Sequence, residues 1–200
     1  MSKAKDWYGR YYAWGELKGN KTNKNGKIYF GWVNYEFGNK YNRLTKYCNN
    51  PEFGLNRFTD NLTELLPKDD VVYQNKNLHN FKFHIPTKEQ CKELINYTDN
   101  YWVNNYDPNK LVHNPEDDGG IQGLNCRVFE GKNRNHLFIP ATGYRYDNDI
   151  YNVGSSCYLW SSSLDLFYPS YACNLYFNSD NVNISNFNRY IGCSVRPILY

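Results

Sequence analysis

The chain has 200 residues, a net charge of +3 and an apolar fraction of 40%, much of it aromatic (20 Tyr, 11 Phe and 5 Trp). This length suits one domain with a sizeable core, so we expect a single domain over residues 1–200. Lys and Arg form no concentrated cluster, which argues against nucleic acid as a partner. No stretch of 18 apolar residues exists, so we expect no membrane insertion.

The first ten residues, MSKAKDWYGR, lack the apolar core of a secretory signal. We therefore expect either a protein that works without its own export signal or a fragment of a longer chain. Asn is unusually frequent, with 30 residues. Together with Gly, it supplies turns and left-handed backbone positions, which predicts short strands and many loops.

The six cysteines have no spacing typical of a metal site. They are Cys48, Cys91, Cys126, Cys157, Cys173 and Cys193, with no CxxC pair, and the four histidines are scattered. A zinc site is therefore unlikely, and we predict no cofactor. Six free thiols in a reducing setting are the simpler interpretation, although the even number also permits three disulfides.

Aromatic segments dominate the first third of the chain. Residues 7–15 alternate loosely and predict a strand. Residues 28–37 form a second aromatic segment, with a turn expected at Gly31. Further on, the acidic residues that follow Pro67 could open a short helix.

The clearest predicted element is a helix over residues 88–97. Thr87 is a good N-cap, and Gln90 lies three residues later, which makes a capping box. Cys91, Leu94 and Ile95 then fall on one face at helical spacing. We expect this face to be buried, with Cys91 as a small core residue.

The rest of the chain predicts strands separated by loops. Residues 115–129 read as an acidic loop, a Gly turn and a strand, and residues 136–146 as a buried strand leading into a turn. The carboxylates within 115–120 could bind calcium or form a solvated turn. We therefore predict an α+β fold with about two helices, short twisted antiparallel strands and long irregular loops.

Several segments in one order resemble a known family. They are YYAWGE (11–16), DD (69–70), IPTKEQCKELI (85–95), GLNCRVF (123–129), LFIPATGYR (137–145), LWSSSL (159–164) and GCSVRP (192–197). Together they resemble C-type-lectin-fold domains of the formylglycine-generating-enzyme-like branch, found in gut bacteria and their phages. The family opens with a further strand that is absent here, so we expect a fragment or a strand supplied by another part of a particle.

The chain departs from the enzymes and the calcium-dependent lectins of this fold. The resemblance implies that the oxidases of this branch use a cysteine pair, and this sequence shows no matching pair. Cys193 lies in the terminal strand motif, and Cys173 has no neighbouring base or cationic cluster to lower its pKa. The sugar-binding tripeptides EPN and QPD are absent. We therefore expect a binding protein rather than an enzyme.

The last forty residues lack five amino-acid types. Residues 1–160 contain 32 Lys, Glu, Gln, Met and Trp, and residues 161–200 contain none. Strands and turns rich in Asn, Ser and Tyr are one explanation, since they disfavour Lys and Glu. A second is mutational: if only the adenines of Asn codons are randomised, the third base stays a pyrimidine, and these five types cannot arise.

This tail resembles the variable regions that diversity-generating retroelements rewrite in C-type-lectin-fold proteins. The resemblance implies a hypervariable ligand-binding region at 157–195. Its predicted variable residues are Cys157, Leu159, Asp165, Leu166, Phe167, Tyr168, Ser170, Tyr171, Cys173, Tyr176, Ile184, Ser185, Phe187, Ile191 and Cys193.

We expect these side chains to stand on one exposed face, supported by buried aromatic residues elsewhere. Alternation along residues 173–177 predicts that Leu175 and Phe177 point inward and that Cys173 and Tyr176 point outward. Arg196 is expected to be paired inside the framework.

The expected function is receptor binding. The expected ligand is a protein or a glycan on a bacterial cell, and the expected location is a virion surface such as a phage tail tip or fibre. A homotrimer would raise a weak site affinity. A bacterial surface adhesin of the same fold is the first alternative, and an oxidase of the formylglycine-generating type is the second.

Overall fold

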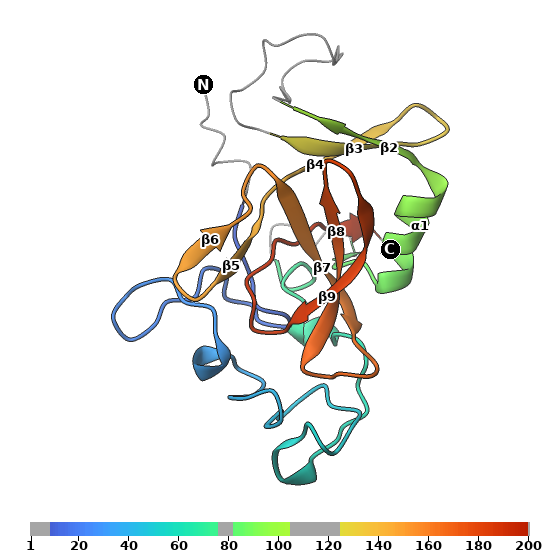
Figure 1. The fold of residues 1–200 in the computed structure, drawn as a ribbon. Coiled ribbons are helices and arrows are strands. Elements are labelled where there is room, and N and C mark those ends of the chain that lie inside the picture. Colours follow the sequence, from blue (N-terminus) through green and yellow to red (C-terminus); the bar gives the residue numbers. More distant parts are fainter. Residues whose placement is uncertain (1–8, 76–81, 105–124, 200) are drawn as a thin grey trace.

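The computed structural model describes residues 9–75, 82–104 and 125–199. This part of the chain is strand-rich, with one α-helix and no closed barrel, which confirms the α+β class (Figure 1). The elements are β1 Phe83–His84, α1 Lys88–Tyr97, β2 Asp99–Val103, β3 Cys126–Glu130, β4 His136–Pro140, β5 Tyr144–Tyr146, β6 Asp149–Tyr151, β7 Ser156–Leu164, β8 Tyr171–Asn178, β9 Val182–Asn188 and β10 Ile198–Leu199.

All strand pairs are antiparallel and fall into four small sheets. Two of these sheets have three strands, in the orders β7-β8-β9 and β2-β3-β4, and the pairs β5–β6 and β1–β10 complete the set. Figure 1 shows β7-β8-β9 in the middle of the molecule, with α1 on one side and the β5–β6 hairpin on the other.

Helix α1 matches the predicted range and its predicted cap. The Gln90 amide donates to Thr87 Oγ1 (3.2 Å), and the Thr87 amide donates to Gln90 Oε1 (2.8 Å). The apolar face of the helix packs against the β7-β8-β9 sheet, with Cys91 buried. The expected second helix is only a 3-10 turn, Pro67–Asp69, so the described residues contain one α-helix.

The predicted strand at 7–15 is wrong within its described residues. Tyr12 forms an isolated antiparallel bridge with Cys193, through hydrogen bonds of 2.8 and 3.0 Å. Beyond it, the Trp14 amide donates to the Arg189 carbonyl, and Gly15 has a φ of +79°. A backbone that turns at Gly15 and changes partners cannot continue a ladder. The segment instead lies along the C-terminal tail.

Strand β8 is covered on both faces. The face that carries Leu175 and Phe177 packs against α1 and Phe129, while Ala172 belongs to the core that contains Trp14 and Trp160. Leu175 and Phe177 point inward as predicted, and Tyr176 is half-exposed.

The outward orientation predicted for Cys173 is wrong, because its side chain is only 1% exposed. Because side chains two residues apart lie on the same face of a strand, Cys173 shares the inward face of Leu175 and Phe177.

Arg189 is the most heavily bonded buried side chain of the core. It follows β9 and is 0% exposed. Its guanidinium donates hydrogen bonds of 2.9–3.0 Å to four neutral oxygens, which are the hydroxyl of Tyr35 and the backbone carbonyls of Lys46, Tyr47 and Pro169. These bonds join the C-terminal tail to the N-terminal third of the chain and to the β7–β8 loop.

Aromatic rings supply the remaining contacts of this guanidinium. The rings of Trp14, Tyr35 and Tyr47 have their centroids 5.1–5.9 Å from the guanidinium carbon. Among the described residues no carboxylate pairs with Arg189, so hydrogen bonds and ring faces carry its desolvated charge.

Arg189→Lys should destabilise the protein strongly. Lysine keeps the charge but cannot reproduce the planar fork, so several buried oxygens would lose their donors. We expect a loss of about 3 kcal/mol or more in the free energy of unfolding, measured by urea denaturation. The control Arg43→Lys, at an exposed arginine, should change it by less than about 0.5 kcal/mol. Equal effects of the two changes would contradict this account of Arg189.

Candidate ligand-binding surface

The predicted variable residues fall into three classes of exposure. The exposed ones are Leu166, Phe167 and Tyr168, at 60%, 82% and 59%. The half-exposed ones are Tyr171, Tyr176, Ile184, Ser185 and Phe187. The buried ones are Cys157, Leu159, Asp165, Ser170, Cys173, Ile191 and Cys193.

The single exposed face expected for these residues is therefore not what the fold produces. Cys157 and Leu159 pack in the cluster under α1, and Ile191 and Cys193 belong to the core around Trp14. The side chains of Cys157, Ile191 and Cys193 are enclosed by protein and are not available to a receptor in this conformation, and Leu159 faces an internal apolar cavity rather than the outer surface. The sequence could not reveal this, because the covering segments come from distant parts of the chain.

The β7–β8 loop carries the three exposed residues. It lies at the end of the central sheet that is farther from the β2-β3-β4 sheet (Figure 1). One contact from the N-terminal third and one from the C-terminal tail hold its backbone. The Asn49 side-chain amide donates to the Leu166 carbonyl (2.9 Å), and Arg189 donates to the Pro169 carbonyl (2.9 Å). The loop is thus fixed at its backbone while the side chains of residues 166–168 face water.

Asp165 organises this loop. Its Oδ1 accepts hydrogen bonds from the backbone amides of Phe167 and Tyr168, both at 2.9 Å. Its Oδ2 accepts one from the side-chain amide of Asn186 on β9. The carboxylate therefore closes a local turn and ties it to the neighbouring strand. Asp165 therefore has a positioning role in addition to the ligand contact predicted for it.

A hollow of about 320 Å³ opens beside the loop, which we call the loop hollow. It is lined by Asp165, Tyr168, Tyr171 and Asn186. All four residues lie within 157–195. The ring centroids of Tyr168 and Tyr171 are 6.4 Å apart. The sequence analysis missed Asn186, because an Asn in the tail looks the same whether its position is fixed or is variable and still unaltered. The Asn-rich composition of the tail was the signal that pointed to it.

The other half-exposed aromatic residues lie on the opposite face of the sheet. Tyr176 and Phe187 contact Tyr158, with ring centroids 4.9 and 4.6 Å apart, and Phe187 also contacts Tyr144 at 5.1 Å. Strand alternation places Tyr176 and Tyr171 on opposite faces of β8. The predicted patch is therefore divided between the loop hollow and this second surface, whose Tyr144 and Tyr158 the sequence did not single out.

The cysteines are buried and free, without disulfides. Burial raises the pKa of every one of these thiols, to about 11 for Cys157 and to about 12 for Cys91. For Cys173 and Cys193, which the oxidase alternative would use, desolvation is the main cause of the raised pKa.

Residues 9–75, 82–104 and 125–199 hold no group of three or more His, Cys, Asp or Glu that could hold a metal ion. The acidic segment 115–120 lies outside these ranges. Within them, no helix has the length and apolar character needed to cross a membrane.

Comparison of the chain with protein-family models, with curated proteins and with solved structures gives no match in any of the three.

Two substitutions of Asp165 should distinguish the contribution of its turn hydrogen bonds to stability from the contribution of its negative charge. Asp165→Ala removes the acceptor for two backbone amides and should lower the free energy of unfolding by about 1–2 kcal/mol. Asp165→Asn keeps a carbonyl acceptor for the same amides and should cost less than half as much. Thermal unfolding of both variants measures the difference. If Asn were as damaging as Ala, the charge rather than the turn would be the main contribution.

Proposed function

We propose that this chain is a C-type-lectin-fold ligand-binding domain whose C-terminal surface is diversified by adenine-directed retroelement mutagenesis. The packing of the C-terminal tail supports this fold. The terminal strand β10 pairs antiparallel with β1, and the segment before it bridges to Tyr12. The tail that resembles a variable region thus lies against framework from the N-terminal half.

The exposure of the tail strengthens the mutational explanation of its composition. More than half of residues 161–199 are exposed or half-exposed, yet none is Lys, Glu or Gln. Such positions ordinarily carry these residues, as Lys18, Glu36 and Glu52 do elsewhere in the chain. Burial alone therefore does not explain their absence, which supports a restricted set of codons.

The loop hollow is the observation that carries the proposal. It is lined only by residues of the predicted hypervariable region, and the exposed Leu166 and Phe167 lie in the same loop. Tyr and Phe supply large contact areas at low entropic cost, and neighbouring Asn and Asp supply polar contacts, as in antibody paratopes. A surface of this kind suits a protein or glycan receptor on a bacterial cell.

The biological setting belongs to the same proposal. A phage tail tip or fibre would present the domain to its host, and a homotrimer would multiply a weak site affinity. A bacterial surface adhesin would use the same surface. The oxidase alternative has less support, because the thiols of Cys173 and Cys193 are buried and have raised pKa values.

Sequencing the genomic neighbourhood tests the origin of the diversity. We expect a reverse-transcriptase gene and a near-copy of the tail-coding segment with AAC or AAT codons at the altered positions. Phe167 and Tyr168 should correspond to Asn codons in that copy. Absence of both the reverse transcriptase and the near-copy would refute the diversification proposal.

Substitution of the exposed loop tests its role in recognition. Phe167→Ser and Tyr168→Ser should each weaken binding of the labelled domain to host cells by about tenfold or more, since exposed aromatic side chains are typical interface anchors. Neither should change the free energy of unfolding by more than about 0.5 kcal/mol.

The matched control is Val33→Ser, at an apolar residue that is 78% exposed but lies outside the tail. It should leave both stability and cell binding unchanged. Cell binding that survives both loop substitutions would place recognition elsewhere, with the surface around Tyr176 and Phe187 as the next candidate.

A further inference from the structure

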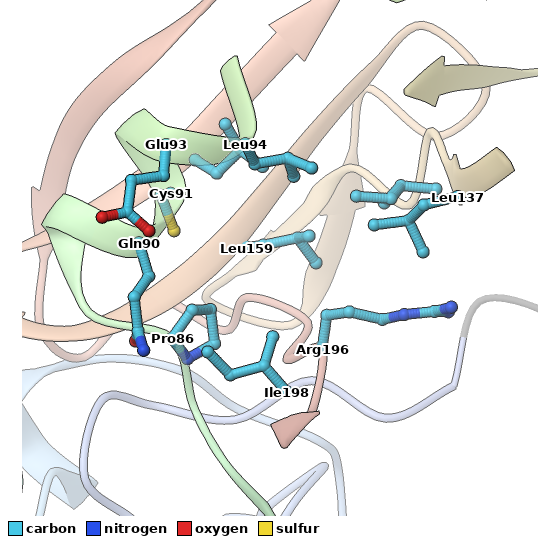
Figure 2. A pocket seen from close by; sticks show the side chains of 11 residues that line it. Pro86, Gln90, Cys91, Glu93, Leu94, Leu137, Leu159, Arg196 and Ile198 are labelled. Atoms are coloured by element: carbon cyan, nitrogen blue, oxygen red, sulfur yellow. The ribbon is translucent and has the colours of Figure 1, made fainter. Parts of the chain in front are cut away.

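A separate apolar pocket of about 320 Å³ lies between α1 and the C-terminal strand (Figure 2). Its walls are mainly aliphatic, with Leu94, Leu137, Ile139, Leu159, Leu175 and Ile198 among them. The polar side chains that border it are Gln90, Glu93 and Arg196. Its size is at the lower end of the range for small-molecule sites, and such sites combine apolar walls with a few polar groups in this way.

Among the described residues, Arg196 is the only cation that lines this pocket. Figure 2 shows its side chain on the side of Leu137, across the pocket from Glu93 on α1. No described residue forms a hydrogen bond or an ion pair with its guanidinium, contrary to the pairing expected from the sequence. Surrounding protein atoms lower the pKa of Arg196 by desolvation, and no carboxylate within the described ranges offsets this effect. Arg196 is exposed, so water reaches its guanidinium, which lies beside the apolar cavity without a partner among the described residues.

A second hollow of about 240 Å³ adjoins the first. It shares Ile139, Leu159 and Arg196 with the apolar pocket, and Arg10 and Ser194 also line it. Arg10, like Arg196, has no ion-pair partner among the described residues. Ser194 is 5% exposed, and its buried Oγ has no hydrogen-bond partner. A buried hydroxyl without a hydrogen-bond partner lowers the stability of the protein, so a polar ligand atom at this place would be favourable.

We propose that the two cavities together form a binding site for a small amphipathic carboxylate. An aliphatic chain of about eight to ten carbons would occupy the apolar pocket, where its burial is favourable. The carboxylate would pair with Arg196, which can bind it through two parallel hydrogen bonds, and Arg10 and Ser194 would lie at the same end.

This site is distinct from the loop hollow. The two share no lining residue, and its walls are supplied mainly by α1, β4 and the C-terminal strand. The proposal therefore does not depend on the receptor-binding proposal, and its variants should leave binding to host cells unchanged.

Isothermal titration calorimetry with decanoate tests the site on the full chain. We expect a Kd on the order of 100 µM for a ligand of this size. Arg196→Gln should weaken binding about tenfold or more, because it removes a charge-assisted pair. Arg43→Gln makes the same change of charge at an exposed residue outside the pocket and should have no effect. The uncharged 1-decanol should bind at least tenfold more weakly than decanoate.

Blocking the cavity gives an independent test. Leu137 is half-exposed at the pocket wall, so Leu137→Trp can fill the cavity and should abolish decanoate binding while the chain stays folded by circular dichroism. Three results would overturn the proposal: no binding of decanoate at 1 mM to the unaltered chain, equal affinity of Arg196→Gln and the unaltered chain, or equal affinity for decanoate and 1-decanol.

Discussion

The rest of the structure depends on the burial of one positive charge. Arg189 is fully enclosed, and it is stabilised by four neutral oxygens and three aromatic rings rather than by an ion pair with any described carboxylate. Its partners come from three segments far apart in the sequence, so one side chain holds together the N-terminal loops, the C-terminal tail and the β7–β8 loop. Few other arrangements of these segments would satisfy all its donors, which favours a single fold.

This constraint separates the source of stability from the proposed source of recognition. The loop backbone is held at Leu166 and Pro169 by side chains from outside it, and Asp165 closes its turn. The exposed side chains of Phe167 and Tyr168 contribute little to these contacts. A surface built in this way can change its side chains without losing its backbone geometry, which is the property that a diversified binding site needs.

Local patterns in the sequence predicted local structure well. The helix over 88–97, its cap at Thr87 and the burial of Leu175 and Phe177 all follow from spacing and residue type. The exposure of the variable positions did not follow, because coverage of β8 on both faces depends on distant segments. The role of Arg189 was equally invisible, since its neutral partners leave no charge pattern in the sequence.

The central claim is that the tail varies through adenine changes over a fixed framework, and sequencing this gene in sibling isolates tests it most directly. The account predicts differences concentrated within 157–195, at codons that derive from Asn, with Arg189 unchanged and with no Lys, Glu, Gln, Met or Trp arising at the changed positions. The half-exposed and exposed positions, such as Phe167 and Tyr176, should differ most often. Differences spread evenly along the chain, or a tail that acquires Lys or Glu, would contradict it.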